Sequence, residues 1–524
     1  MGSLVRVVTS SESAAGDASA IGAGIPSRAL MQRAGAAAAE IALRYGEHLD
    51  AGVLILAGPG NNGGDAWVVA RALGEMGARV RVIEPSPAKS GDAAAERALA
   101  LESLNDAQVT TGALPEAFDQ GERLVVDGLL GTGAQGDPRG KIADSITRAN
   151  AMRARGATMI AIDAPSGMDT TTGASAKIAI AANMTVTFGT VKRGHLINRA
   201  ASGRIVVIDI GLGRHAGGSD SVPRLVDEAW VSQQVPPIPA NAHKGIRKKL
   251  AIVGGAKGMA GATVLAARAA LRSGIGMVKL IVSDESFPVI QESEPAALAA
   301  PWPETDEAMD RDVVGWADCV VAGPGLGRSD ASRALLERLL RRWTGPIVMD
   351  ADALTLFEGQ ASALAELIGR RPALITPHPV EFGRLAGRDV KDVLANRFDI
   401  GAELSSTIGA AVLLKGTPTV VSSVDGQRLV SAMGTPALAT AGSGDVLSGI
   451  AGTMLAQIGD PFKAGAVAAW VHGRAAERVP TSSGGARGIS LDDIVAELRD
   501  SWNFDRRVGR YPVLAELPEI GPMR

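Results

Sequence analysis

Short runs of apolar and often β-branched residues alternate with longer Ala-rich stretches in both halves of the chain. In the first half, residues 53–56 form such a run and are followed by a Gly-rich segment and by 66–76, where the spacing predicts a helix. Strands that alternate with helices predict parallel βαβ units, in a sheet that helices cover on both faces. The other strand-like runs of this half are 80–83, 124–126, 159–162 and 205–208.

The alternation stops after residue 213 and restarts at 250. Residues 214–220 are polar and Gly-rich, and three prolines interrupt 233–242, a composition that is typical of domain joints. The chain has 524 residues, whereas single hydrophobic cores stop growing at about 250–300. We therefore predict two α/β domains, 1–215 and 243–524, with a linker at 216–242. The strand-like runs of the second half are 250–253, 277–282, 319–322, 347–349, 373–375 and 411–414.

Charge and cysteine content exclude several classes of protein. The net charge of -3 gives no strong attraction to nucleic acid or to membranes. The single cysteine, Cys319, excludes an intrachain disulfide framework and lies in an apolar run, where we expect a buried thiol. The first thirty residues lack a signal-peptide pattern, and no run has the ~18–20 apolar residues that a membrane span needs. We therefore expect a cytoplasmic protein that binds neither membranes nor nucleic acid.

Candidate chemistry in the first half begins with the glycine loop at 58–65, which follows a strand and opens a helix. Ligands of parallel α/β sheets bind beyond the carboxyl ends of the strands, and helix N-termini attract phosphates. The spacing fits neither the usual dinucleotide fingerprint nor a P-loop, and a tight turn explains the loop equally well. Asp127 and Asp163 end two further strands, each before a Gly-containing loop. Three polar strand-end loops favour one shared site over separate turns or helix caps.

These motifs, with 31–35 and Thr187-Phe188-Gly189, resemble the NAD(P)H-hydrate epimerase family, also called the YjeF N-terminal domain. The resemblance covers nearly all of 1–215 and implies a Rossmann-like three-layer α/β sandwich. It implies a K⁺ ion held by Asn62, Asp127 and Ser166, and Asp163 at the reacting ring of the substrate. The family usually has Gly after the position of Asp65, whereas Ala66 and Trp67 follow here, and Trp67 either packs in the core or shapes the pocket. The residues implied to bind the hydrated dinucleotide are Asn61, Asn62, Gly63, Gly64, Asp65, Gly131, Thr132, Gly133, Ala134, Gln135, Gly136, Asp137 and Asp163.

The most informative stretch of the second half is 434–449. Gly442-Ser443-Gly444 predicts a turn whose amides face an anion, and Asp445 follows at the start of a helix. A capped helix start is the plainer explanation. Loops after other strands favour a site, because Lys415, His378 and a pair of acids at 350 and 352 all follow strands.

This half resembles the ADP/ATP-dependent NAD(P)H-hydrate dehydratases, which have a ribokinase-like α/β fold. The match runs from about His243 to the end of the chain and is best at 434–449. The resemblance implies Asp445 as the catalytic base and a Mg²⁺ ion bound with ADP or ATP. The residues implied to contact the hydrated dinucleotide are Ala262, Gly325, His378 and Asp445. Those implied to contact the adenine nucleotide are Lys415, Gly416, Thr417, Pro418, Thr419 and Gly444.

Together the two resemblances imply a bifunctional enzyme that repairs hydrated NADH or NADPH. The substrate carries a hydroxyl at C6 of its ring in either of two configurations. The first domain would interconvert the two epimers, and the second would dehydrate the S form at the expense of ADP or ATP. The alternative is a ribokinase-like small-molecule kinase fused to a non-catalytic nucleotide-binding module, which the fold alone does not exclude. For either enzyme we expect a homo-oligomer.

Overall fold

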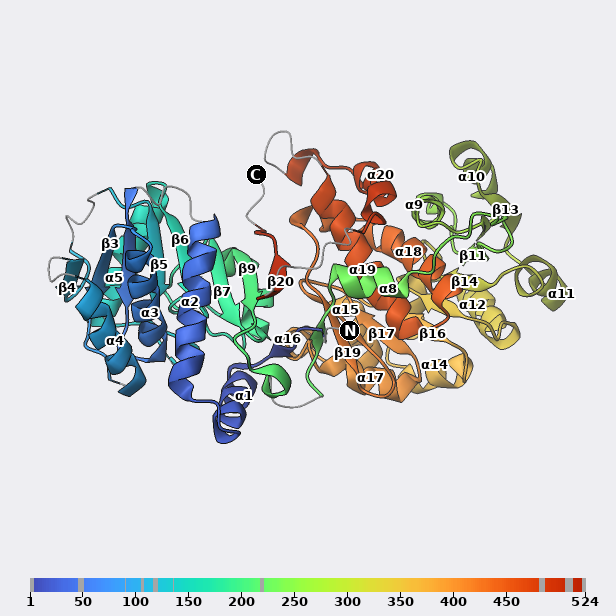
Figure 1. The fold of residues 1–524 in the computed structure, drawn as a ribbon. Helices are drawn as coiled ribbons and strands as arrows, with labels where there is room; N and C mark the ends of the chain where they lie inside the picture. The colour runs from blue at the N-terminus through green and yellow to red at the C-terminus, as the bar shows by residue number, and fades with distance from the viewer. Residues whose placement is uncertain are drawn as a thin grey trace. The chain divides into compact units, whose positions relative to one another are not determined.

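The computed structural model describes residues 4–45, 51–89, 91–104, 108–115, 121–134, 136–216, 221–479, 486–504 and 512–520. The chain forms two compact units (Figure 1). The first unit contains Met1–Val222 and Val508–Pro522, and the second contains Pro223–Arg507 and Met523–Arg524. No helix among the described residues is long and apolar enough to cross a membrane.

The first unit is built on an eight-stranded sheet in the order β20-β9-β7-β6-β5-β2-β3-β4, in which only β20 is antiparallel to its neighbour. A separate parallel pair joins β1 to β8. The strands are β1 (Val7–Val8), β2 (Val53–Ala57), β3 (Val80–Glu84), β4 (Val109–Thr111), β5 (Leu124–Gly128), β6 (Thr158–Ile162), β7 (Met184–Phe188), β8 (Val191–Lys192), β9 (Arg204–Ile208) and β20 (Val513–Leu517). The helices are α1 (Ser10–Gly22), α2 (Ser27–Tyr45), α3 (Asn61–Glu75), α4 (Gly91–Ser103), α5 (Gly140–Ala154), α6 (Arg193–Ile197) and α7 (Arg199–Ser202).

Alternate residues of the central strands face two separate cores. Val53 and Ile55 of β2 pack with α2, α3 and α4, whereas Leu54 and Leu56 pack with α5 on the opposite face. Figure 1 shows these helices on the two faces of the sheet. Because side chains of a strand point alternately to its two faces, a strand that is apolar throughout belongs between two layers of helices. The predicted three-layer α/β sandwich is confirmed.

The second unit contains a ten-stranded sheet in the order β10-β19-β18-β17-β16-β15-β14-β11-β12-β13. The pairs that β18 makes with β17 and β19 are antiparallel, and the others are parallel. Its strands are β10 (Arg224–Leu225), β11 (Lys249–Val253), β12 (Met277–Val282), β13 (Leu298–Pro301), β14 (Cys319–Ala322), β15 (Ile347–Met349), β16 (Ala373–Ile375), β17 (Ala411–Leu414), β18 (Thr419–Ser422) and β19 (Arg428–Ser431).

Helices cover this second sheet on both faces as well. One apolar core joins the strands to α12, α14, α15 and α17, while α9, α18 and α19 pack on the other side. Cys319 is buried in the central strand β14, as expected. The helices are α8 (Glu228–Gln234), α9 (Ala260–Arg272), α10 (Phe287–Ser293), α11 (Asp306–Met309), α12 (Asp330–Arg342), α13 (Asp352–Thr355), α14 (Ala361–Ile368), α15 (Pro379–Ala386), α16 (Val390–Ala395), α17 (Ile400–Ile408), α18 (Ser443–Ile458), α19 (Pro461–Arg478) and α20 (Leu491–Ser501).

The predicted division of the chain differs from the structure in two places. Residues 223–242, expected as linker, supply β10, which pairs with β19, and α8, which Asp227 caps by accepting from the Trp230 amide at 2.7 Å. The end of the chain leaves the second unit and adds β20 to β9 of the first. Glu516 of β20 is held there by Arg204 at 2.9 Å and by the Tyr45 hydroxyl at 3.1 Å. The strand covers a sheet edge that would otherwise expose unpaired backbone groups.

Candidate active sites

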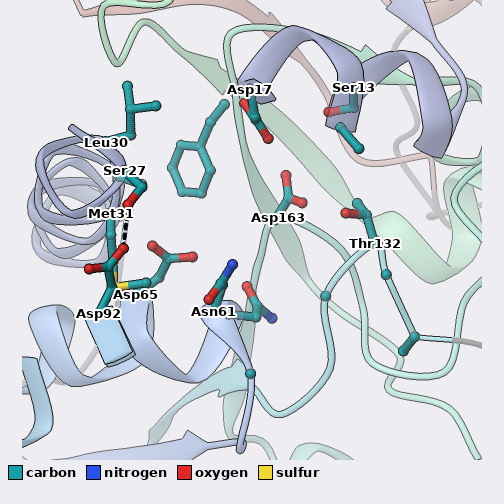
Figure 2. A pocket seen from close by; sticks show the side chains of 18 of the residues that line it. Ser13, Asp17, Ser27, Leu30, Met31, Asn61, Asp65, Asp92, Thr132 and Asp163 are labelled. Carbon is teal, nitrogen blue, oxygen red and sulfur yellow. Dashed lines mark hydrogen bonds between the residues drawn. The ribbon is translucent and has the colours of Figure 1, made fainter. Parts of the chain in front are cut away.

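A cavity of about 660 Å³ opens at the carboxyl end of the first sheet (Figure 2). Helices α1 and α2 line one side of it, and the loops after β2, β5 and β6 line the other. The loop after β2 enters α3 at Asn61, so main-chain N–H groups of the first helical turn lie at the cavity wall. Such a helix start attracts phosphate groups, as expected for this loop.

Asp163 and Lys192 form an ion pair in the wall of this cavity. Lys192 ends the short strand β8, and its buried Nζ donates to Asp163 Oδ1 and, at 2.7 Å, to Thr187 Oγ1. Thr187 in turn donates to Asp163 Oδ1 at 3.0 Å. Burial alone would raise the pKa of Asp163, but the charge and hydrogen bond of Lys192, the charge of His195 and the hydrogen bond of Thr187 together outweigh it and lower that pKa. The carboxylate is therefore ionised and fixed in place, as a general base must be.

Two further carboxyl groups, of Asp17 on α1 and Asp65 on α3, line the same cavity (Figure 2). Burial, the charge of Asp163 and the charge of Asp17 raise the pKa of Asp65 well above its usual range. Burial likewise raises the pKa of Asp17, against the attraction of Lys192. The cavity thus contains carboxyl groups whose pKa values are shifted in opposite directions, since that of Asp163 is lowered and those of Asp17 and Asp65 are raised.

Asn62, Asp127 and Ser166, the predicted cation ligands, are buried and lie together. Asp127 accepts from Ser166 Oγ at 2.6 Å, from the Ser166 amide at 2.8 Å and from the Leu129 amide at 3.2 Å. Asn62 Nδ2 donates to the Leu130 carbonyl at 3.0 Å, and Ser166 Oγ donates to the same carbonyl at 3.3 Å.

This cluster has the donor set that a monovalent cation prefers. Asn62 Oδ1 is buried without a hydrogen-bond partner, and no ion pair to Asp127 forms among the described residues. Burial, partly offset by its three hydrogen bonds, raises the pKa of Asp127 to about 6. A buried carboxylate and an unpaired amide oxygen, with no nitrogen or sulfur ligand nearby, fit a hard cation such as K⁺.

Most residues expected to bind the dinucleotide in the first unit line the cavity, and a few do not. Gly63 and Gly64 instead permit close packing, because a Cβ on them would meet the Gly58 carbonyl oxygen at 1.8 Å and Met31 Sδ at 2.5 Å. Gly136 and Asp137 are exposed and outside the cavity wall, and Gln135 lies outside the described residues. The predicted residues that line the cavity are Asn61, Asn62, Asp65, Gly131, Thr132, Gly133, Ala134 and Asp163.

Trp67 has no place in this cavity. Its side chain is completely buried in the core on the α3 side of the sheet, beneath Arg97, whose guanidinium carbon lies 5.6 Å from the ring centroid. Glu84 at the end of β3 binds that guanidinium through both carboxylate oxygens, at 2.7 and 3.0 Å. Of the two roles considered for Trp67, core packing is the one that the structure supports.

In the second unit, Asp445 lies in the first turn of α18, which begins at Ser443 after the left-handed Gly442 (φ 92°). A side chain on Gly442 would collide with Leu265 of α9 and Leu491 of α20, so the turn requires glycine. Burial, followed by the charge of Asp350, raises the pKa of Asp445 to about 7 against the attraction of Lys415. The carboxyl group is therefore close to the midpoint of its titration near neutral pH, which suits general base catalysis.

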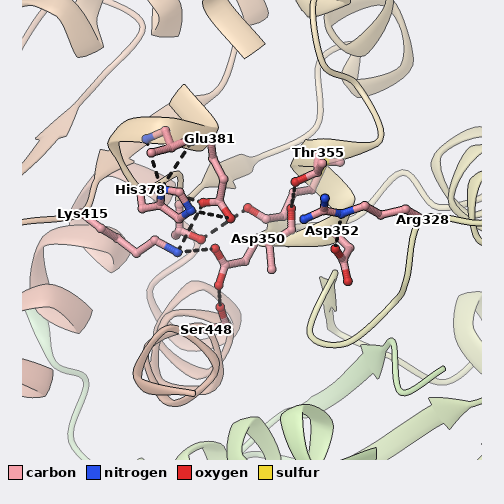
Figure 3. Close-up of polar contacts among 12 residues, drawn as sticks. Arg328, Asp350, Asp352, Thr355, His378, Glu381, Lys415 and Ser448 are labelled. Atoms are coloured by element: carbon pink, nitrogen blue, oxygen red, sulfur yellow. Dashed lines mark hydrogen bonds and ion pairs between the residues drawn. The ribbon is translucent and has the colours of Figure 1, made fainter. Parts of the chain in front are cut away.

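Lys415 is the centre of a network beside Asp445 (Figure 3). Its Nζ lies 2.7 Å from Asp350 Oδ1 and 3.7 Å from Glu381 Oε2, and Ser448 of α18 donates to Asp350 Oδ2 at 2.7 Å. A Cβ on Gly444 would lie 3.4 Å from Lys415 Nζ, so this helix start and the cation are neighbours, as expected of a phosphate site. Burial would lower the pKa of Lys415, but Asp350 and Glu381 raise it, so the ammonium stays charged.

The other predicted site residues of the second unit lie in three different parts of it. Ala262 and Gly325 are adjacent, since a Cβ on Gly325 would lie 3.2 Å from that of Ala262. His378 is half-exposed and caps α15, where its Nδ1 accepts from the Val380 amide at 3.1 Å. Residues 416–418 lie in the connection from β17 to β18, which begins at Thr419, and buried Arg397 donates to the carbonyls of Thr417 and Pro418.

The structure adds Lys192 and a role for Asp350 to the residues found from the sequence. Lys192 follows the Thr187-Phe188-Gly189 motif by three residues, and its position after a tight turn could have been noticed. Asp350 stands out as one of two acids at a strand end, but its pairing with Lys415, 65 residues away, has no local signal. Among the described residues, no group of three or more His, Cys, Asp or Glu side chains could hold a metal ion.

Two protein families match the two parts of the chain. Residues 27–194 match the YjeF-related protein N-terminus, and residues 250–499 match NAD(P)H-hydrate dehydratase. A crystal structure of the ADP/ATP-dependent NAD(P)H-hydrate dehydratase from Bacillus subtilis, co-crystallised with ATP and Mg²⁺, is 27% identical with a TM-score of 0.48. The matched region covers 55% of this chain and 100% of the B. subtilis chain.

Named relatives match the chain across both of these parts. A bifunctional NAD(P)H-hydrate repair enzyme from Salinibacter ruber is 36% identical over 87% of this chain and 88% of its own length. The enzyme of the same name from Escherichia coli is 32% identical over 85% of this chain and 84% of its own length. With both parts matched in order and at this identity, the chain belongs to the family of bifunctional NAD(P)H-hydrate repair enzymes.

Proposed function

We propose that the first unit interconverts the two epimers of hydrated NADH or NADPH and that the second dehydrates the S epimer, with ADP or ATP as co-substrate. The observation that carries this proposal is the Asp163–Lys192 pair in the cavity of the first unit. A half-buried, charge-paired carboxylate beside an open cavity suits proton transfer with a bound substrate, and a nucleotide-binding scaffold has no use for it.

Epimerisation at C6 needs a group that removes the proton of the C6 hydroxyl. Asp163 serves as this base, because Lys192 and Thr187 fix its carboxylate and keep it ionised. The phosphates of the dinucleotide lie at the start of α3 and along 131–134, where main-chain N–H groups line the cavity. The substrate's ring is then presented to the Asp163 side of the pocket.

The cluster of Asn62, Asp127 and Ser166 would hold K⁺. The ion would neutralise the buried Asp127 carboxylate and give Asn62 Oδ1 the partner that it lacks. It would also order the loops after β2, β5 and β6, each of which supplies one ligand and one part of the cavity wall.

Dehydration in the second unit needs the C6 hydroxyl to become a better leaving group, which phosphorylation achieves. Asp445 accepts the hydroxyl proton, while the amides at the start of α18 and Lys415 stabilise the transferring phosphoryl group. Residues 415–419 and Gly444 contact the nucleotide, and Ala262, Gly325 and His378 contact the hydrated dinucleotide. Since the described residues form no three-ligand metal cluster, Mg²⁺ would be held mainly by the nucleotide phosphates, as is usual for this ion.

The test is to incubate the purified protein with a mixture of both epimers and to follow the absorbance of the restored reduced ring. With ADP or ATP, we expect both epimers to be consumed, whereas without nucleotide we expect only their interconversion, resolved by chromatography. Asp445→Asn should stop dehydration and leave interconversion intact, and Asp163→Asn should do the reverse. Retention of both activities by both variants would contradict the proposal.

A further inference from the structure

Asp65, like Asp17 but unlike Asp163 and Asp92, lines the cavity without a hydrogen-bond or ion-pair partner among the described residues. It lies in the second turn of α3 and is half-buried, and its side chain forms no hydrogen bond or ion pair with any described residue. Its oxygens are not enclosed by protein either, since they are absent from the buried unsatisfied atoms of the described chain. The carboxyl group is therefore free to contact a molecule in the cavity.

The charged groups that face Asp65 favour its neutral form. Asp163 of the strand-end loop and Asp17 of α1 repel a negative charge there, and only Lys192 attracts it. Lys192 is already bonded to Asp163 and Thr187. The cations of α2 have other partners, because Arg28 binds Glu96 at 2.7 Å and Arg33 binds the Ile210 carbonyl at 3.2 Å. From α4, Asp92 lines the cavity and accepts from Ser27. Asp17, Asp65 and Asp163 thus interact with a single ammonium group, that of Lys192.

We propose that Asp65 is the general acid of epimerisation and works with Asp163 as a two-proton couple across the cavity. Asp163 takes the proton of the C6 hydroxyl, the C6–O double bond forms, and the bond from C6 to the ring nitrogen breaks. The released electron pair goes to the ring nitrogen, which takes the proton of Asp65. Rotation about the C5–C6 bond turns the other face of the aldehyde to the nitrogen. Ring closure returns both protons to where they began, so no further reactant is needed.

Asp17 is a positioning residue, which acts through its charge on the protonation of Asp65. Figure 2 shows its carboxyl group above Asp163, on the side of the cavity that α1 covers. After burial and the charge of Asp163, the negative charge of Asp17 is the third cause that raises the pKa of Asp65. Removing that charge should make Asp65 lose its proton at a lower pH, because ionisation becomes less unfavourable.

This inference rests on the proposed epimerase activity, and the experiment separates the two. Epimerisation without nucleotide is measured between pH 5 and 9 for the full-length wild type and for the Asp65→Asn, Asp17→Asn and Asp144→Asn variants. Asp144 is an exposed acid of α5, on the opposite face of the sheet, and controls for the loss of one charge. Dehydration of the pure S epimer by the same samples checks that the second unit is intact in each variant, and hydrogen exchange of the β5 amides checks that the first unit is folded.

We expect Asp65→Asn to slow epimerisation by ~10²–10⁴, the usual contribution of a general acid or base. Asp17→Asn should retain activity, with its alkaline limb moved to lower pH by roughly half a unit or more, while Asp144→Asn matches the wild type. Wild-type protein that does not epimerise would refute the proposed function itself. An active wild type with Asp65→Asn within tenfold of it, or with superimposable profiles for Asp17→Asn and Asp144→Asn, would overturn the inference alone.

Discussion

Removing K⁺ should destabilise the first unit more at high pH than at low pH, because of Asp127. Burial raises the pKa of this carboxyl from 3.8 to about 6, so its ionised form costs the folded state about 3 kcal/mol. A carboxyl whose pKa is raised by folding contributes stability at low pH and loses it as pH rises through the folded pKa. Without a cation, roughly half of the 3 kcal/mol should therefore be lost between pH 5 and 8.

A bound K⁺ ion should remove this pH dependence, since it favours the carboxylate and brings the pKa of Asp127 back toward its usual value. We expect saturating K⁺ to stabilise the first unit by about 1.4 kcal/mol more at pH 8 than at pH 5. The same ionic strength of tetramethylammonium, which is too large for the site, serves as the reference. In Asp127→Asn, K⁺ should no longer increase the free energy of unfolding of the first unit at either pH.

The assay is urea denaturation of the full chain, sampled by a brief deuterium pulse at one common pH and read by mass spectrometry. Peptides from β5 report the first unit, and peptides from β14 report the second, which should not respond to K⁺. If K⁺ stabilises the first unit equally at pH 5 and pH 8, or still stabilises it in Asp127→Asn, the reasoning is refuted.

Three other perturbations have defined outcomes. The dehydration rate should rise with pH through about 7, because Asp445 must be ionised to accept a proton, and Asp350→Asn should move this midpoint to lower pH in the same rate assay. Lys192→Met should raise the pKa of Asp163 and slow epimerisation by ~10²–10⁴ at neutral pH, with dehydration of the S epimer unchanged; an unaffected epimerisation rate would contradict the pairing. Deletion of 512–524 should expose β9, seen as faster hydrogen exchange in its amides and as a greater tendency to aggregate, whereas unchanged exchange would show that β20 does not protect this edge.

The sheet pattern and the places of the sites follow from local features of the sequence. Buried strands such as β2 are apolar throughout, which predicts helices on both faces. Asn62, Asp127 and Ser166 lie at or just beyond the carboxyl ends of parallel strands, and these ends meet at one edge of the sheet, so their proximity was predictable. The same rule accounts for Lys415 and Asp350 in the second unit.

What the sequence does not indicate depends on long-range packing. Nothing near Asp17 marks it as part of a cavity, because its helix becomes a wall only after β1 pairs with β8. The glycines at 63 and 64 resemble ligand-binding glycines, yet they serve the approach of neighbouring backbone and of Met31. The strand at 513–517 pairs with residues some 300 positions earlier, and its short run of five residues carries no sign of its partner.

The return of β20 to β9 has a consequence for synthesis of the chain. The second unit is an insertion within the first, so the ribosome must make residues 209–512 between the two strands. At roughly 5–20 residues per second, this interval lasts roughly 15–60 s. During that time β9 is a bare edge on a nearly finished sheet, able to pair with the same segment of another nascent chain. Faster translation of 223–507, or a chaperone that shields the edge of β9, should therefore raise the yield of active protein.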